Sequence, residues 1–373
     1  MKRRDFLQKL GTGTVAGGTL LVAGCTQKEC DSVRPSEVAT QSRTIDWKMV
    51  TTWPKNFPGL GTGANFLADL IGQMSGGRIQ VKVYGAKELV PPFEVFDAVS
   101  RGTAEMGHGA SYYWKGKSEA AQFFSAVPFG LTADEMNAWL YHGGGMDLWQ
   151  ETYQPFGLLP MAAGNTGVQM AGWFNREIDS LDDLRGLKMR IPGLGGEVLA
   201  RAGGVPVSMP GGELFTALQS GAIDATEWVG PYNDLAFGLY KAARYYYYPG
   251  WHEPGTTLEC IVNQKAFDAL PEELQVIVRN AVRVANQDML AEYVARNNQA
   301  LQTLTQEHGV EVRKLPDEVL GRLLELSEQV VAEIAEKDSM SRRVFESFQA
   351  FRDQVIQWSD ISDRAYLNAR SSG

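Results

Sequence analysis

Cysteine and histidine are scarce in this sequence, and the common motifs of enzyme active sites are missing from it. The 373 residues include three cysteines, which contain no C-x-x-C pair and cannot build a disulfide framework. The four histidines lack metal-ligand spacing, and there is no P-loop, G-x-S-x-G or H-E-x-x-H motif. The glycine-rich stretches at 59–63 and 193–196 do not match G-x-G-x-x-G. These absences argue against an enzyme and against an organic cofactor.

Positive charge is also in short supply. The formal net charge is −9, and an acidic surface repels phosphate backbones, so nucleic acid is a poor candidate partner. Hydrophobic residues make up 44% of the chain and charged residues 21%, which is typical of a folded globular protein. The length suits two domains, because single cores rarely grow beyond about 250–300 residues.

The first 24 residues have the features of an export signal. Lys2, Arg3 and Arg4 precede an apolar stretch that, at about 14 residues, is too short to span a bilayer as a helix. The arginine pair and the weak hydrophobicity resemble the twin-arginine export pattern. We therefore expect residues 1–24 to be removed and the protein to act in the periplasm. A cytosolic N-terminal helix is the alternative.

Cys25 ends a sequence that resembles a lipobox, Val22 to Cys25. Cleavage before Cys25 would make it the lipidation site and anchor the protein to a membrane, whereas cleavage nearby would leave a free cysteine. The segment 25–44 is polar and lacks apolar periodicity, so we interpret it as a tether. Cys30 lies in this tether and could pair with Cys260 in an oxidising compartment, but the apolar surroundings of Cys260 favour a small buried side chain.

Strand and helix patterns alternate after the tether. Polar and apolar residues alternate at 47–51 and 78–84, whereas 65–74 and 91–101 have helical spacing. This alternation predicts an α/β fold with a parallel or mixed sheet. The segments 272–306 and 317–336 carry long apolar stripes with few breakers, which predicts long C-terminal helices.

One helix-and-strand unit occurs twice. The segment from Pro91 to Gly102 matches the segment from Pro210 to Gly221 in its proline, glutamate, phenylalanine, alanine and glycine positions, and a short acidic strand follows each copy. Two copies indicate two related lobes with a ligand cleft between them. Chance similarity between amphipathic helices is the alternative. We place the parts of the chain as follows: lobe I at 45–165, lobe II at 166–253, and a return to lobe I with the C-terminal helices at 254–373.

Several side chains stand at the carboxyl ends of predicted strands, where α/β sheets bind ligands. Arg190 could hold a carboxylate through two parallel hydrogen bonds. Glu227 could bind a hard cation, and Trp228 could wall a pocket. Gln169 lies near the expected crossing between the lobes, and its amide can serve a ligand and a cation through different atoms. By position alone, each could also be an ordinary surface or core residue.

An aromatic run, Tyr245 to Trp251, leads into His252 and Glu253. Most of its rings should pack in the core. Glu253 would be costly to bury without a partner, so we expect a cation or an arginine beside it. Tyr113 belongs to an aromatic stretch after a first-lobe strand and could face this region across the cleft.

Six stretches carry a family resemblance: Ala126–Phe129, Tyr141–Gly145, Gly164–Met170, Gly186–Arg190, Asp224–Pro231 and Tyr245–Trp251. Together they resemble the extracytoplasmic solute-binding subunits of tripartite ATP-independent periplasmic (TRAP) transporters, the DctP-like family. The resemblance is strongest to the branch that binds 2-oxoacids. It extends over nearly the whole chain after the tether.

The resemblance implies a two-lobed periplasmic solute-binding fold that closes on a monocarboxylate, with no catalytic residues. Arg190 matches an arginine that clamps the carboxylate, and Gln169 matches a residue that touches both substrate and metal. Glu227 and Trp228 match a metal-site pair, in which Trp228 uses its backbone carbonyl and also borders the substrate. Glu253 matches a further acidic residue at the substrate and metal site. Tyr113 is an additional candidate substrate contact.

The resemblance also implies a metal cation, which is sodium in the 2-oxoacid branch and calcium in a lactate-binding relative. We therefore expect sodium rather than calcium. It implies TRAP permease membrane subunits as partners and a homodimer formed through the C-terminal helices. Trp114 and Lys115 depart from the family pattern, which has a tyrosine and a tryptophan there, and this changes the expected contacts between the lobes.

The leading interpretation is a transport receptor for a pyruvate-like 2-oxoacid that binds together with a cation. One alternative is a receptor for lactate or another carboxylate with calcium. Another is an exported oxidoreductase, because the twin-arginine route often carries cofactor enzymes. A structural lipoprotein that binds no small acid is the third.

Overall fold

The structure is a computed structural model that describes residues 44–371. The predicted export signal, Cys25, Cys30 and nearly all of the tether lie outside the described residues. Within the described chain, no helix has the length and apolarity needed to cross a lipid bilayer. Cys260 is a fully buried free thiol, which confirms the expectation of a small buried side chain.

The first sheet has five strands in the order β2-β1-β3-β10-β4. β1 runs parallel to β2 and β3, while β10 runs antiparallel to β3 and β4. The strand bounds are β1 Ile45–Thr51, β2 Ile79–Tyr84, β3 Met106–Gly109, β4 Leu158–Asn165 and β10 Thr257–Asn263.

The second sheet has six strands in the order β11-β9-β5-β8-β6-β7. β6 runs parallel to β7 and β8, β5 runs antiparallel to β8 and β9, and β11 runs parallel to β9. The strand bounds are β5 Gly172–Phe174, β6 Lys188–Arg190, β7 Val205–Val207, β8 Ala225–Thr226, β9 Tyr245–Tyr248 and β11 Glu311–Lys314.

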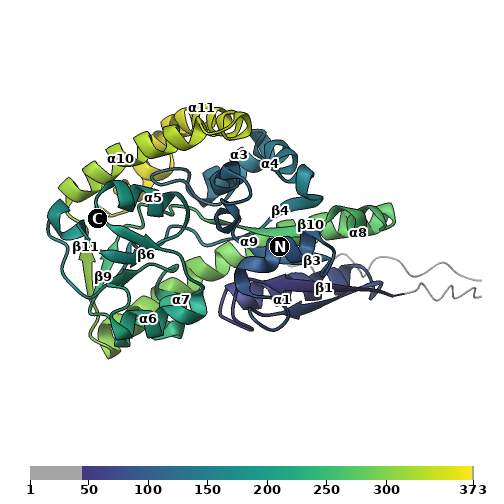
Figure 1. Cartoon of the computed structure of the whole chain (residues 1–373), viewed down its shortest axis with the longest axis horizontal. Helices are drawn as coiled ribbons and strands as arrows, with labels where there is room; N and C mark the ends of the chain where they lie inside the picture. Colours follow the sequence, from purple (N-terminus) through teal and green to yellow (C-terminus); the bar gives the residue numbers. More distant parts are fainter. Residues whose placement is uncertain (1–43, 372–373) are drawn as a thin grey trace, which may run out of the picture. The chain divides into compact units, whose positions relative to one another are not determined.

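Helices flank both sheets (Figure 1). The α-helices are α1 Leu60–Met74, α2 Val95–Ser100, α3 Ala133–His142, α4 Gly145–Tyr153, α5 Gly193–Arg201, α6 Leu214–Ser220, α7 Pro231–Phe237, α8 Gln264–Asp268, α9 Glu272–Gln302, α10 Asp317–Ala335, α11 Ser339–Ile361 and α12 Asp363–Ser371. The short helical turns are η1 Pro92–Glu94, η2 Ser111–Trp114, η3 Glu119–Phe124, η4 Gln154–Phe156, η5 Leu181–Leu184, η6 Gly211–Glu213, η7 Leu239–Lys241 and η8 Thr303–Glu307.

Three long helices connect the parts of this architecture. α9 packs against β4 and α1 beside the first sheet, and against α7 beside the second. α10 packs against α5 and α11, and α11 packs against α3 and α4 (Figure 1). The predicted α/β class with long C-terminal helices is confirmed.

The repeated unit is present in both sheets as local structure. Pro91 and Pro210 each precede a single turn, η1 or η6, that continues into α2 or α6. Gly102 and Gly221 follow these helices, and both have a φ of 75°, a left-handed conformation that favours glycine. β3 and β8, the strands after the two copies, each lie between one parallel and one antiparallel neighbour. The shared topology supports two related lobes.

β11 departs from the predicted division of the chain. We assigned 254–373 to lobe I and the C-terminal helices, but β11 pairs with β9 and forms an edge of the second sheet. Its four residues lie between two long helices, and they pair with an aromatic strand more than 60 positions earlier. No local sequence pattern predicts such a distant pairing. The remaining lobe boundaries stay our proposal.

A buried carboxyl group with neutral hydrogen-bond partners lies on β10. Glu259 is 1% exposed. Its Oε2 accepts a hydrogen bond from the Tyr153 hydroxyl at 2.9 Å, and its Oε1 accepts one from the Trp114 indole. Burial raises the pKa of Glu259 to about 7, against the opposing effect of these hydrogen bonds. The folded protein therefore favours the protonated form.

We expect the contribution of Glu259 to the stability of the fold to fall as pH rises from 4.5, the ordinary pKa of a glutamate, to about 7. The folded state holds an extra proton in this window, so its stability falls with pH and levels off above the folded-state pKa. Glu259→Gln removes the titrating group. Across this pH window, the free energy of unfolding of the variant should therefore fall by about 2–3 kcal/mol less than that of the wild type. Urea unfolding at several pH values measures this difference. An identical pH dependence in both proteins would contradict the assignment.

Candidate functional site

The predicted arginine and glutamate meet at the carboxyl ends of two neighbouring strands. Arg190 is the last residue of β6, and Glu227 follows β8, whose Thr226 is paired with Arg190. The Arg190 guanidinium donates through Nη1 to Glu227 Oε1, and both side chains are buried, at 1% and 0% exposure. A buried charge requires such a partner. The strand-end position that the sequence predicts for a ligand site is thus occupied by a buried ion pair.

The two other predicted polar residues lie on two of the three connections between the sheets. Gln169 lies between β4 and β5, and Glu253 lies between β9 and β10. The Gln169 backbone N–H donates to the Glu253 carbonyl at 3.2 Å, and the Gly250 N–H donates to the Gln169 carbonyl at 2.9 Å. A Cβ on Gly250 would lie 2.3 Å from that carbonyl oxygen, so only glycine allows the close approach. The crossings are therefore held together by backbone pairing at the site itself.

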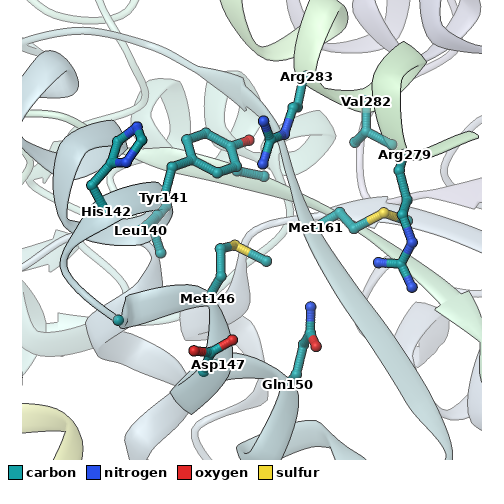
Figure 2. A pocket seen from close by; sticks show the side chains of 12 residues that line it. Leu140, Tyr141, His142, Met146, Asp147, Gln150, Met161, Arg279, Val282 and Arg283 are labelled. Carbon is teal, nitrogen blue, oxygen red and sulfur yellow. The ribbon is translucent and has the colours of Figure 1, made fainter. Parts of the chain in front are cut away.

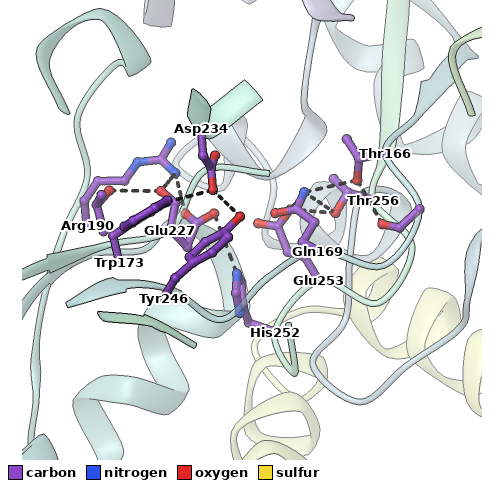
Figure 3. A network of polar contacts seen from close by, with 12 residues as sticks. Thr166, Gln169, Trp173, Arg190, Glu227, Asp234, Tyr246, His252, Glu253 and Thr256 are labelled. Carbon is purple, nitrogen blue, oxygen red and sulfur yellow. Dashed lines mark hydrogen bonds and ion pairs between the residues drawn. The ribbon is translucent and has the colours of Figure 1, made fainter. Parts of the chain in front are cut away.

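Side chains reinforce this pairing. The Gln169 amide donates through Nε2 to Glu253 Oε2 at 2.8 Å and to the Thr166 and Thr256 hydroxyls at 3.1 Å each. The Thr256 hydroxyl donates to the same Glu253 oxygen at 2.5 Å. Figure 3 shows this cluster beside the Arg190 and Glu227 pair. The predicted polar residues thus belong to one connected polar region.

Several oxygen atoms in this region are buried without a hydrogen-bond partner. Within residues 44–371, no hydrogen bond reaches Gln169 Oε1 or Glu227 Oε2. Ligand atoms of Glu227, His252 and Glu253 lie within 4.8 Å of one another. Amide and carboxylate oxygens are the ligands that hard cations such as sodium and calcium accept, and unmet buried acceptors are costly. The residues present therefore fit a cation.

The electrostatics of the region also favour a bound cation. Burial, together with the nearby Glu227 carboxylate, raises the pKa of Glu253 to about 7. Two carboxyl groups close together in a buried site resist joint ionisation unless positive charge offsets them. Arg190 supplies one positive charge. A bound cation would supply another and would favour the ionised carboxylates.

Residues from the first-sheet side complete the surroundings of Arg190. Its Nη2 donates to the Tyr113 hydroxyl at 3.2 Å, so the structure brings the predicted Tyr113 to the site. Its guanidinium also lies 5.0 Å from the Trp228 ring centroid. The Trp228 indole packs edge-on against Trp53 and Phe57, at 6.1 and 6.4 Å between ring centroids. Trp228 therefore packs against aromatic rings from the opposite side of the site.

Four residues of this region escaped the sequence prediction: Trp53, Thr166, His252 and Thr256. The spacing of the histidines gives no indication of His252, whose Nε2 lies 3.6 Å from Glu227 Oε2 in a group of side chains that could hold a cation. His252 directly precedes the predicted Glu253, so sequence adjacency could have pointed to it. Thr166 lies three residues before Gln169 and Thr256 three after Glu253, a spacing with no recognisable signal of its own.

Comparison with known proteins identifies the family. Residues 49–338 match the family described as bacterial extracellular solute-binding protein, family 7, or DctP. The chain belongs to this family. It is a solute-binding protein of the TRAP type, and the resemblance predicted from the sequence is confirmed.

Three similar proteins give this DctP family member its context. A monocarboxylate 2-oxoacid-binding periplasmic protein of Nostoc sp. is 44% identical over 100% of both chains. A TRAP solute-binding protein of Colwellia psychrerythraea, solved with calcium and pyruvate, is 43% identical with a TM-score of 0.85, covering 88% of this chain and 100% of its own. One from Pseudoalteromonas atlantica, solved with sodium and pyruvate, is 44% identical with a TM-score of 0.85, covering 87% and 99%.

Proposed function

We propose that this protein is the receptor of a TRAP transporter and binds a small 2-oxoacid such as pyruvate together with a metal cation. The observation that carries the proposal is the buried Arg190 beside Glu227, with unmet oxygen acceptors on Glu227 and Gln169. The relatives that bind pyruvate with sodium or calcium are 43% and 44% identical to this chain. A binding role without catalysis agrees with the absence of active-site motifs from the sequence.

The proposed site residues contact the ligand, the cation or both. Arg190 holds the ligand carboxylate, because its Nη2 carries two protons and has the Tyr113 hydroxyl as its acceptor among the described residues. Gln169, Glu227 and Glu253 offer side-chain oxygens to the cation, and Trp228 offers its backbone carbonyl. Tyr113 and the Trp228 ring border the ligand. A cation here would link an anionic ligand to carboxylates that would otherwise repel it.

We propose sodium as the natural cation, although calcium accepts the same oxygen ligands. Calorimetric titration of the metal-depleted protein with pyruvate and with lactate, in sodium or in calcium buffer, tests the assignment. We expect the tightest binding for pyruvate with sodium. Preference for lactate with calcium would favour the alternative receptor, and no heat with either acid in either buffer would contradict the proposal.

We further propose export by the twin-arginine route, a lipid anchor on Cys25 and delivery of the ligand to membrane permease subunits. A homodimer through the C-terminal helices is part of the same proposal. It draws support from exposed apolar side chains near the end of the chain: Trp358, Ile361, Tyr366 and Leu367. Mass spectrometry of the mature N-terminus and sedimentation of the purified protein test these points.

Two exposed ion pairs join segments that we assign to different lobes. Lys115 Nζ lies 2.6 Å from Glu197 Oε1, and Lys87 Nζ lies 2.9 Å from Glu213 Oε1. Lys115 is a position where this chain departs from the family pattern, so this contact gives the departure a structural role. We expect both pairs to favour the closed, ligand-bound arrangement.

Lys115→Ala should weaken pyruvate binding about two- to fivefold, because an exposed ion pair contributes about 0.2–1 kcal/mol. The difference should shrink as ionic strength rises. Lys117→Ala is a matched control, because Lys117 pairs with Asp97 at 2.9 Å within the proposed lobe I. Pyruvate titrations at low and high salt measure the effect. Equal affinities of the Lys115 variant and wild type at low salt would refute a role for the Lys115–Glu197 ion pair in closure.

A further inference from the structure

A cavity lies outside the candidate site and shares none of its residues. Its volume is about 530 Å³, and α3, α4, β4 and α9 supply its walls. Figure 2 shows side chains from these elements pointing into a common space. The volume falls within the range of about 300–1,000 Å³ typical of small-molecule sites.

Two arginines from α9 line one side of the cavity. Arg279 and Arg283 are exposed and stand one helical turn apart. Arg279 lies 4.7 Å from the Phe267 ring centroid, and Arg283 lies 4.4 Å from that of Tyr141. Neither arginine forms an ion pair with another described residue. Stacking on a ring orients a guanidinium while leaving its N–H edge free to bind an anion.

The remaining charge in the cavity is small. Asp147 contributes one carboxylate, and His142 contributes an imidazole. The two arginines therefore outweigh the one acidic group. Arginines elsewhere on the surface form ion pairs, as Arg201 does with Glu333 and Arg343 does with Glu151. The local surplus of positive charge favours an anionic ligand.

Apolar side chains also line the cavity. Leu140, Met161 and Val282 are buried, and Met146 is half-buried. Methionine side chains are flexible and polarisable, so they adapt to apolar groups of different shape. Met146 comes from α4 and Met161 from β4, and both side chains line the cavity (Figure 2). An apolar surface next to two free guanidinium groups matches a molecule with an anionic head and an apolar tail.

We propose that this cavity is a second ligand site, specific for a small amphipathic carboxylate. Arg279 and Arg283 bind the carboxylate, and the apolar tail lies along Met146, Met161 and Val282. The transported 2-oxoacid differs from such a ligand, because pyruvate has no apolar chain to cover the methionines. The inference stands independently of the proposed function.

Calorimetric titration with octanoate tests the second site. We expect saturable binding of octanoate to the full protein, with and without pyruvate present. Acetate, which lacks the tail, and octanol, which lacks the charge, should bind at least tenfold more weakly. Competition between octanoate and pyruvate would place octanoate in the first site and overturn the proposal, as would the absence of saturable octanoate binding.

Variants locate the site. The double variant Arg279→Gln and Arg283→Gln should lose at least tenfold in octanoate affinity while retaining pyruvate affinity. Arg296→Gln is the matched control, because Arg296 is an exposed arginine of the same helix outside this cavity. Retained octanoate affinity in the double variant, or an equal loss in the control, would overturn the proposal. Sedimentation of each variant excludes a change in assembly as the cause.

Discussion

Arg190→Ala should reduce pyruvate affinity at least a hundredfold. Its guanidinium is the buried cation placed to receive the ligand carboxylate, and it already bonds Glu227 and the Tyr113 hydroxyl. Losing one partner of a buried, hydrogen-bonded charge pair costs about 2–5 kcal/mol or more. Calorimetric titration with pyruvate in the presence of saturating cation measures the loss.

Two further variants separate this effect from damage to the fold. Arg190→Ala leaves the Glu227 carboxylate buried without its partner, so a second variant, Arg190→Lys, keeps the charge but not the two-pronged geometry. It should also bind pyruvate at least tenfold more weakly. Arg201→Ala is the matched control, because Arg201 is half-exposed and pairs with Glu333. Wild-type affinity in a folded Arg190→Ala or Arg190→Lys protein would refute the carboxylate clamp.

Glu227→Gln should remove the dependence of pyruvate binding on the cation. The substitution keeps the size of the side chain but removes the carboxylate charge. In the wild type, this carboxylate bonds Arg190 through Oε1, and its Oε2 has no hydrogen-bond partner among the described residues. We expect pyruvate affinity at least tenfold below that of the wild type, and equal with and without added sodium or calcium. Titrations in metal-depleted and metal-replete buffers measure both effects.

The control for this experiment is another buried glutamate. Glu259→Gln changes a carboxyl group on β10 whose partners are Trp114 and Tyr153 and which takes no part in the proposed cation site. It should keep the cation dependence of the wild type. A Glu227→Gln protein that still binds pyruvate more tightly when cation is added would place the cation elsewhere.

The parts of the site that the sequence predicted are those with a local signature. Arg190 and the pair Glu227 and Trp228 follow short strands, and ligand sites in α/β sheets gather at strand carboxyl ends. Gln169 was predicted from its place near the expected crossing between the lobes, and Glu253 from the cost of burying a carboxylate among aromatic residues. Their mutual hydrogen bond joins positions 84 residues apart, so no local pattern could reveal it.

What the sequence missed depends on tertiary packing. His252 enters the acidic cluster because the connection from β9 to β10 pairs with the connection from β4 to β5, which carries Gln169. β11 joins the second sheet by pairing with β9, and the sequence of its four residues does not indicate this pairing. The arginines of α9 form a cavity wall only because α3 and α4 pack opposite them. Periodicity indicates that a helix exists but not which helices face each other.

The most direct test of the central claim is a linked titration of pyruvate and cation. We predict that pyruvate affinity rises with sodium concentration, and that pyruvate raises sodium affinity by the same factor, because coupling between two ligands is reciprocal. The effect should vanish in Glu227→Gln. Pyruvate affinity that stays constant from metal-depleted buffer to saturating sodium and saturating calcium would contradict joint binding at this site.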